Sequence, residues 1–209
     1  LLNAAAVRDG LFGQINEKQK QSLTSVTKSL HYFRDTVRKF LDLSRIEKGE
    51  LEVHKKQVSL RKDVFDPCME TFNAEITNKQ MAIANNIAAE VKINGDLDLL
   101  RIVANNLIGN AVKYGLEKGK IIISSEDLAD KVQIEVYNDS RPIREDEKEK
   151  LFKKFSRLEV PKGKKIKGTG LGLFLTKEII TQHGGDIWLR PEENGNTFIF
   201  QIEKCPDTA

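Results

Sequence analysis

The clearest pattern in the chain is a long run, near its start, in which apolar residues recur at steps of three and four. Between Asn16 and Lys48 the run contains no Gly or Pro, and this spacing predicts one apolar stripe along an amphipathic helix. The stripe consists of Leu23, Val26, Leu30, Phe33, Val37, Phe40, Leu41 and Ile46. Asn16, with Gln19 three residues later, predicts an N-terminal capping box, and Gly49 predicts where the helix ends.

Residues 1–9 have the pattern of the end of a preceding helix, so the first 49 residues predict an αα-hairpin. A helix of about 30 residues cannot bury such a stripe alone. Two hairpins are therefore expected to pair in a four-helix bundle, with the stripe as their packing surface.

From residue 50 onward the pattern is mixed, with strand-like alternation and helical periodicity in turn. Strands are expected over residues 51–58, 81–84, 90–93, 120–125, 132–137, 186–189 and 197–203. Helices are expected over 59–79, 96–114, 145–155 and 170–182. Turns are expected across 127–130 and at Asn194-Gly195. Because strands come in groups with the helices on one face, the pattern predicts an α+β two-layer sandwich over residues 50–209 rather than a doubly wound sheet.

Composition excludes several classes of protein. The chain is 39% hydrophobic and 31% charged, which is typical of a folded domain. A net charge of +3 is too small to predict nucleic-acid binding. Lys162, Lys164, Lys165 and Lys167 crowd together, and they predict either a solvated loop or a site that meets an anion.

The two cysteines, Cys68 and Cys205, lie in no CxxC or His-rich cluster, so neither a zinc site nor a disulfide framework is predicted. Reduced thiols in the cytoplasm are the expected state. No apolar run approaches the ~18–20 residues of a membrane span. Leu1 is not Met, so we expect the chain to be cut from a longer protein, whose membrane anchorage stays open.

Asn106 and Asn110 lie four residues apart on an expected helix, and Lys113 follows one turn later. The three side chains therefore share one face. An amide oxygen can ligate Mg²⁺, and a lysine can neutralise phosphate oxygens. The alternative is an ordinary polar helix face, which the spacing alone favours.

Two further motifs are weak when taken singly. Asn138 and Asp139 end an expected strand, where either side chain can accept a hydrogen bond from an adenine amino group; the alternative is a plain turn. Phe152 and Phe155 lie three residues apart, and they either anchor a mobile segment or belong to the core.

The segment from Gly168 to Leu173 reads GTGLGL and leads directly into an expected helix. Glycines allow positive φ and close approach of the backbone, and the N–H groups of a helix start favour a phosphate. The segment lacks the GK[ST] half of a Walker A loop. It does not follow a strand, so it is not a Rossmann fingerprint either.

In this order and spacing, the four motifs resemble the catalytic domain of sensor histidine kinases, which belongs to the ATPase superfamily of gyrase B, the Hsp90 chaperones and MutL. Residues 40–49, FLDLSRIEKG, are similar to the end of the kinase dimerisation helix. His183-Gly184-Gly185 before a strand is a further feature of the family. The resemblance covers nearly the whole chain. It implies a Bergerat-type ATP-binding domain over residues 50–209, behind a truncated dimerisation and histidine-phosphotransfer hairpin over residues 1–49.

The resemblance also implies roles for individual residues, with ATP and Mg²⁺ as ligands. Asn110 matches the Mg²⁺ ligand, Asn106 the asparagine near the phosphates, and Lys113 and Tyr114 the residues that flank phosphate and nucleotide. Phe152 and Phe155 match the base of an ATP lid that spans Ser140 to Lys167, in which Arg157 and Lys167 become candidate γ-phosphate contacts. The rest of the implied ATP-binding set is Asn138, Asp139, Ile143, Gly168, Thr169, Gly170, Leu171, Gly172 and Leu173. Of these, Gly168, Gly170 and Gly172 shape the phosphate end, where Thr169 and Leu171 donate from the backbone.

One motif departs from the family pattern, Asp-x-Gly-x-Gly. Here Asn138 stands at the Asp position, and Ser140 and Pro142 stand at the glycine positions. An asparagine oxygen can still accept the adenine hydrogen bond, without charge assistance. Asp139 is the rival acceptor, but strand alternation predicts that it points to the opposite side. The loss of both glycines predicts a stiffer turn.

The family's phosphoacceptor histidine, which an acidic residue follows, has no match here. His31, His54 and His183 are the three histidines, and none precedes Asp or Glu. We expect the acceptor upstream of Leu1, so this chain should bind ATP without phosphorylating itself.

The resemblance implies that the parent forms a homodimer through its helical bundle and passes the phosphoryl group to a response regulator receiver domain. A chaperone or mismatch-repair ATPase would need a glutamate where Asn106 stands. A degenerate nucleotide-binding domain that regulates a partner by dimerisation stays open because of the altered turn.

Overall fold

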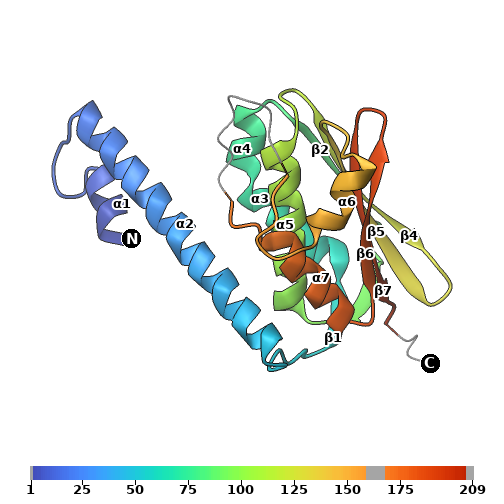
Figure 1. The fold of residues 1–209 in the computed structure, drawn as a ribbon. Coiled ribbons are helices and arrows are strands. Elements are labelled where there is room, and N and C mark those ends of the chain that lie inside the picture. The colour runs from blue at the N-terminus through green and yellow to red at the C-terminus, as the bar shows by residue number, and fades with distance from the viewer. Residues whose placement is uncertain (1, 159–167, 206–209) are drawn as a thin grey trace. The chain divides into compact units, whose positions relative to one another are not determined.

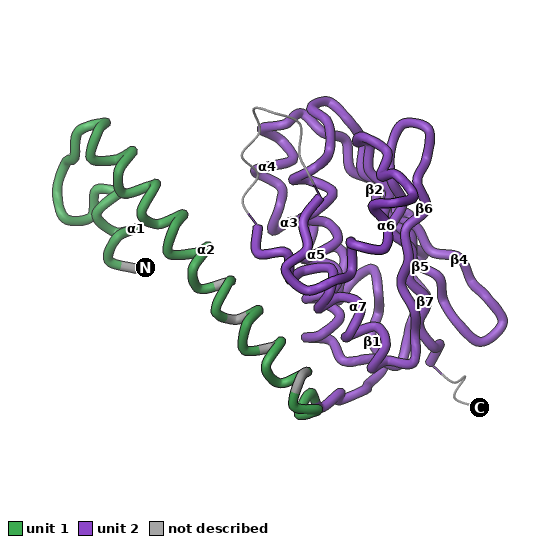
Figure 2. The backbone as a smooth tube through the Cα atoms, in the orientation of Figure 1, with its two compact units in different colours: residues 1–51 green, residues 52–209 purple. Residues whose placement is uncertain are grey.

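The structure is a computed structural model that describes residues 2–158 and 168–205. The chain divides into two compact units, residues 1–51 and residues 52–209 (Figure 2). No helix among the described residues has the length and apolar character needed to cross a bilayer.

The first unit contains α1 (Leu2–Arg8) and α2 (Glu17–Glu47). The predicted capping box is confirmed: Asn16 Oδ1 accepts from the Gln19 N–H at 2.9 Å, and Gln19 Oε1 accepts from the Asn16 N–H at 2.9 Å. Gly49 has φ of +69°, the left-handed conformation in which helices commonly end. The expected stripe leaves Phe33 66% and Phe40 59% exposed.

The second unit is built on a five-stranded sheet in the order β2-β4-β5-β7-β6. Its strands are β2 (Ala82–Asn86), β4 (Lys120–Asp127), β5 (Lys131–Asp139), β6 (Asp186–Glu192) and β7 (Gly195–Glu203). β2 and β4 are parallel and the other pairs are antiparallel. A separate antiparallel pair joins β1 (Lys56–Ser59) to β3 (Lys92–Gly95).

Helices cover one face of the five-stranded sheet, as Figure 1 shows. They are α3 (Asp66–Thr71), α4 (Asn73–Asn78), α5 (Leu97–Tyr114), α6 (Glu145–Leu151) and α7 (Gly172–Gln182). Alternate residues of β5 are buried, Val132, Ile134 and Val136 among them. Leu107 and Ile108 of α5 are fully buried as well. The predicted α+β sandwich is confirmed.

The helix expected over 59–79 is present from Leu60 to Asn78, as a π-helical turn (Leu60–Phe65), α3 and α4, with Phe72 between the last two. Pro67 at the start of α3 has no N–H to donate to the turn before it. Two other predicted boundaries are wrong. The helix expected to reach residue 155 ends at Leu151. The last hairpin turns at residues 193–194, and Gly195 already pairs with Glu192. Gly195 is needed for another reason: a Cβ there would lie 2.4 Å from the Asn138 carbonyl oxygen.

Candidate functional site

Helix α5 begins and ends at defined side-chain contacts. Asp96 caps its N-terminus, since Oδ1 accepts from the N–H groups of Asp98 at 3.0 Å and Leu99 at 3.2 Å. At the other end, Lys79 Nζ donates to the carbonyls of Val112 at 2.6 Å and Lys113 and Gly115 at 3.2 Å. Carbonyls at a helix C-terminus have no partner within the helix, so the ammonium group stabilises this end.

His183, directly after α7, supports the same helix from its N-terminal side. Its fully buried ring accepts the Asp96 N–H at Nε2 over 3.0 Å, so Nδ1 carries the proton and donates to the Ile179 carbonyl at 2.8 Å. Burial lowers the pKa of His183. Asp96 Oδ2 also accepts from the His54 N–H at 3.0 Å. One carboxylate therefore joins the start of α5 to the segment that precedes β1.

The two asparagines of α5 have different surroundings. Asn106 is buried, and its Nδ2 donates to the Gly172 carbonyl at 3.1 Å and to Thr176 Oγ1 at 3.3 Å. Asn106 therefore ties α5 to the first turn of α7. Asn110 lies one turn later and is half-buried, and its side chain forms no hydrogen bond within the part of the chain that the structure describes. Its amide oxygen remains available to a ligand.

Lys113 reaches the glycine loop of residues 168–172. A Cβ built on Gly168 would lie 2.6 Å from Lys113 Nζ, so the ammonium group lies directly against the loop backbone. The same Nζ lies 5.0 Å from the ring centroid of Tyr114, which is exposed. Burial raises the pKa of the Tyr114 hydroxyl. The end of α5 thus places one cation beside backbone that sequence analysis assigned to phosphates.

The glycine loop has the conformation that its sequence predicts. Gly170 has φ of +72°, and a Cβ there would lie 2.6 Å from the Phe155 carbonyl carbon and 2.8 Å from the Ser156 oxygen. Leu171 is buried, Leu173 is half-buried, and the Leu171 N–H donates to Thr169 Oγ1 at 3.4 Å. No side chain caps the start of α7. The first N–H groups of α7 are therefore suited to an anion.

The segment after α6 is attached to α7 by two cation–π pairs of opposite sense. Lys177 of α7 lies 5.8 Å from the Phe152 ring, and Lys154 lies 4.9 Å from the Phe174 ring. Phe155 is 62% exposed and has φ of +59°, uncommon for a residue with a side chain. Arg157 is exposed. All four lysines of the predicted cluster, Lys162, Lys164, Lys165 and Lys167, lie outside the described residues.

At the end of β5, neighbouring residues face opposite sides of the sheet, as alternation predicted. Asn138 is 4% exposed and lies on the helix-covered side with Val136. Its Nδ2 makes one long contact, 3.4 Å to the Asp139 carbonyl. Asp139 accepts from the Tyr137 hydroxyl at 2.5 Å and the Lys120 N–H at 2.9 Å. The hydrogen bond from the Tyr137 hydroxyl to Asp139 raises the pKa of Tyr137 to about 12. Both Asp139 carboxylate oxygens already accept a hydrogen bond from the protein, so the Asn138 amide oxygen is more available to a hydrogen-bond donor of a ligand.

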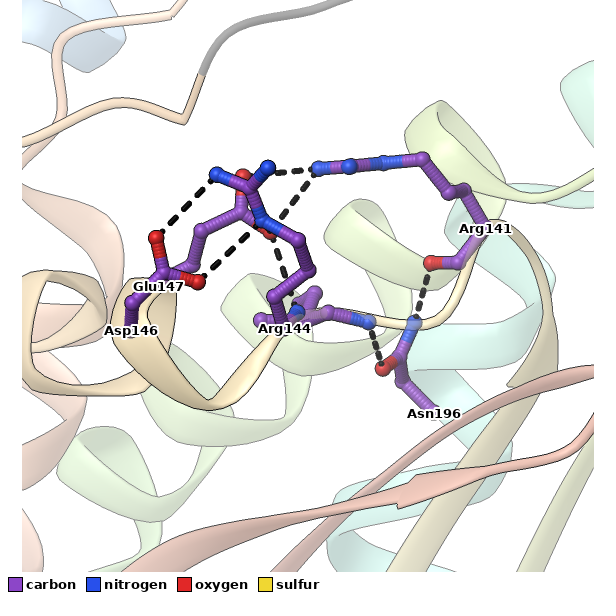
Figure 3. A network of polar contacts seen from close by, with 6 residues as sticks. Arg141, Arg144, Asp146, Glu147 and Asn196 are labelled. Carbon is purple, nitrogen blue, oxygen red and sulfur yellow. Dashed lines mark hydrogen bonds and ion pairs between the residues drawn. The ribbon is translucent and has the colours of Figure 1, made fainter.

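Two residues at this end were missed by sequence reasoning, and Figure 3 shows both. Asn196 of β7 is buried; it donates to Ser140 Oγ at 2.7 Å and the Arg141 carbonyl at 2.8 Å, and accepts the Ile143 N–H at 2.9 Å. A buried asparagine in a strand, where asparagine is disfavoured, was the available signal.

The second missed residue is Glu147 of α6, which is also buried. It accepts from Arg141 Nη2 at 2.9 and 3.0 Å and from the Arg144 N–H at 3.0 Å. These bonds, that from the Arg144 backbone first, lower the pKa of Glu147. Its spacing, three residues into a helix, is that of a capping box.

Helix α5 connects the glycine loop, at one end of the site, to the end of β5, at the other. The Leu116 N–H, just beyond the helix, donates to the Asp139 carbonyl at 2.9 Å. Asn110, Lys113 and the glycine loop therefore belong to the same framework as the end of β5. Among the described residues, no group of three or more His, Cys, Asp or Glu side chains could hold a metal ion. A hard cation here would depend on Asn110 and on the oxygens of a bound ligand.

Comparison with known proteins agrees with this arrangement. Residues 95–206 match the family described as "Histidine kinase-, DNA gyrase B-, and HSP90-like ATPase". The chain is 32% identical to the adaptive-response sensory kinase SasA of Crocosphaera subtropica, over 83% of this chain and 46% of that protein. It is 28% identical to hybrid signal transduction histidine kinase B of Dictyostelium discoideum, over 90% of this chain and 10% of that protein. The chain thus spans less than half the length of these curated relatives.

Solved structures give the same result. The catalytic domain of histidine kinase ThkA, in a nucleotide-free form, is 32% identical with a TM-score of 0.65, covering 75% of this chain and 99% of that one. ThkA in complex with the response regulator protein TrrA is 27% identical with a TM-score of 0.68, covering all of this chain and 60% of that one. Full-length ShkA with AMPPNP shares the fold, with a TM-score of 0.77 at 20% identity.

Proposed function

The chain belongs to the family of histidine kinase-, DNA gyrase B- and HSP90-like ATPases and carries the ATP-binding catalytic domain of a sensor histidine kinase. On this basis we propose that it serves phosphoryl transfer from ATP to a histidine outside these residues. The observation that carries the proposal is the contrast within α5. The Asn106 Nδ2 group donates its hydrogen bonds to the first turn of α7. The Asn110 amide, in contrast, has no protein partner among the described residues and lies one turn from Lys113.

Each end of the site has a proposed role. Asn138 accepts from the adenine amino group, while Lys113 and the N–H groups at the start of α7 neutralise the phosphates. The Asn110 amide oxygen is the ligand that α5 offers to Mg²⁺, and a bound Mg²⁺ neutralises charge on the phosphates. Arg157 and Lys167 are proposed to meet the γ-phosphate from the lid.

The acceptor histidine is proposed to lie in a part of the parent protein other than these residues. His183 is buried as a neutral ring with both nitrogens bonded, so it cannot accept a phosphoryl group without loss of its place in the core. The side chains of His31 and His54 are exposed, and neither belongs to the residues proposed to bind the nucleotide. This chain alone is therefore expected to bind ATP without labelling itself.

Two partners are proposed for the parent. Residues 1–49 supply part of a dimerisation hairpin, because α2 exposes an apolar stripe that a second copy would cover. A response regulator is proposed to receive the phosphoryl group, and the likeness to ThkA, which has been solved in complex with the response regulator protein TrrA, supports this.

The deciding measurement is calorimetric titration of this chain with ATP in the presence of Mg²⁺. We expect Asn110→Ala to weaken ATP binding by at least about ten-fold, since the metal loses its protein ligand. Asn105→Ala, an exposed asparagine on the same helix, is the matched control and should leave binding unchanged. Equal effects of the two variants would remove the basis of the proposal.

A second measurement tests phosphoryl transfer with the parent protein and labelled ATP. Acid-labile label on the parent, lost in Asn110→Ala, is expected. ATP binding without any label would favour the alternative, a nucleotide-binding domain that regulates a partner. Phosphohistidine on the present chain alone would contradict the location proposed for the acceptor.

A further inference from the structure

We propose that Asn196 is a positioning residue at the base end of the site, the region around Asn138 and the turn after β5 where the nucleotide base would bind. Through that turn, Asn196 sets the preference for ATP over GTP. This inference rests on the proposed function, since it concerns the same nucleotide. It goes further by assigning base selectivity to a residue that belongs to none of the motifs of the site.

Asn196 and Asn138 are cross-strand neighbours. They are Cα partners in the antiparallel pairing of β5 with β7. Both are buried on the helix-covered side, where they continue the rows formed by Val136 and Phe198. Directly opposed residues of this kind have Cβ atoms about 4.5–5.5 Å apart. A substitution at Asn196 can therefore shift the position of Asn138 directly, without acting through another residue.

The Asn196 amide is fully used. Its two N–H donors go to Ser140 Oγ and to the Arg141 carbonyl, and its oxygen accepts from the Ile143 N–H. The side chain is only 3% exposed, so these bonds are shielded from bulk water. The three bonds reach both sides of Pro142 and fix the path of the backbone as it leaves Asn138. Figure 3 shows the bond from Asn196 to the Arg141 carbonyl.

Among the described residues, one hydrogen bond orients the Asn138 amide: Nδ2 donates to the Asp139 carbonyl at 3.4 Å, so the position of the amide oxygen depends on the backbone that carries both residues. An amide oxygen there accepts from the 6-amino group of adenine, whereas guanine has a carbonyl oxygen at that position. Two facing acceptors repel, so Asn138 rejects guanine as long as Nδ2 keeps this bond and the oxygen faces the base.

This arrangement predicts which property is lost when Asn196 changes. If the turn relaxes, the Asn138 oxygen moves away from its aligned position and the adenine bond weakens. GTP never had that bond, so its affinity should change little. The ratio of the two affinities, rather than the overall affinity, should therefore fall.

The experiment measures dissociation constants for ATP and GTP with Mg²⁺ by calorimetry, with urea unfolding in parallel, on Asn196→Asp and Asn196→Ala. Asn196→Asp has nearly the same shape, keeps the acceptor for Ile143 and loses both donors. We expect ATP to bind about ten-fold more weakly and GTP to change less than two-fold. Gln201→Ala is the control: it removes the hydrogen bond to Gln133 Oε1 from the same strand and should leave the ratio unchanged.

Three outcomes would overturn the inference. The first is a wild-type chain that binds ATP and GTP equally. The second is an equal loss of both nucleotides in the Asn196 variants, which assigns them a purely structural effect. If neither variant folds, Ser140→Ala removes one partner of the same amide, and a ratio that stays unchanged there is the third.

Failure of the inference differs from failure of the proposed function. When Asn110→Ala abolishes ATP binding but the Asn196 variants keep the ratio, only the inference is lost. When Asn110→Ala has no effect, the site itself is misassigned.

Discussion

At the end of the site proposed to bind the base, around the turn after β5, buried side chains hold the backbone, whereas in the glycine loop, proposed to bind the phosphates, the backbone is held by its own conformation. The turn after β5 is fixed by the Asn196 amide and the Glu147 carboxylate. The glycine loop depends on positive φ at Gly170 and on close contact with Phe155 and Ser156. Among the described residues, Asn106 supplies the bond between the loop's end and α5.

The difference follows from what each end is proposed to bind. A base is recognised by the direction of a few hydrogen bonds, so the groups around it have to be fixed in advance. Phosphates are recognised by charge and by many backbone N–H groups, so the loop needs close approach and few side chains. The two ends should therefore respond to different kinds of substitution.

The largest effect is expected from Gly170→Ala at the phosphate end. A Cβ at φ of +72° is strained, and this one would meet backbone atoms at 2.6 and 2.8 Å. We expect ATP affinity to fall at least about thirty-fold and the free energy of unfolding to fall by about 2 kcal/mol. Calorimetry should show the loss of affinity. Gly168→Ala is the control for stability alone, because its Cβ would meet only the flexible tip of Lys113 and should leave the free energy of unfolding nearly unchanged. Urea unfolding should separate the two variants, and equal losses of stability would contradict this account of the loop.

A smaller effect is expected from Lys79→Met, which acts on the helix end that joins the two ends of the site. Three carbonyls lose their ammonium partner, so unfolding should become easier by about 1–3 kcal/mol. Because Lys113 lies in the released turn, ATP and GTP should both weaken by a similar factor. Lys62→Met, an exposed lysine, should change stability by less than about 0.5 kcal/mol. A shift in the ATP-to-GTP ratio would show that this helix end serves the base alone.

The smallest effect is expected from pH, through His183. Its pKa in the folded chain is lowered from 6.5, chiefly by burial and further by Lys55, against the opposing effects of the Ile179 carbonyl and Asp96. As the pH falls below about 6.5 the unfolded chain takes up a proton first, so stability is complete above that pH and declines below it. His183→Gln should flatten this slope in urea titrations from pH 7.5 to 5. Wild-type stability that does not change over this range would contradict the buried neutral ring.

Local signals predicted the parts of the site that depend on local chemistry. The start of α5 follows from Asp96 as a cap, and the glycine loop from its own sequence. The change from a π-helical turn to α3 within the helix expected over 59–79 has a local signal too, because Pro67 is visible in the sequence.

Contacts between distant segments could not be predicted in this way. Asn196 lies 53 to 56 residues from the groups that it binds. Asn106 found its partner in α7, 66 residues away. Such pairs are set by strand register and helix packing, which a single sequence does not specify. For the same reason, the spacing of Asn106 and Asn110 could not predict that Asn106 would bond to α7.

The Asp96 carboxylate, which caps α5 and also accepts from His54, decides where this domain can be joined to others. A fusion that begins at β1 would keep every strand and helix of the second unit, yet would leave Asp96 Oδ2 without its backbone donor. The junction of a chimaeric kinase built from this domain therefore belongs before His54. A boundary drawn from secondary structure alone would remove one partner of Asp96, the residue that caps the helix carrying Asn110.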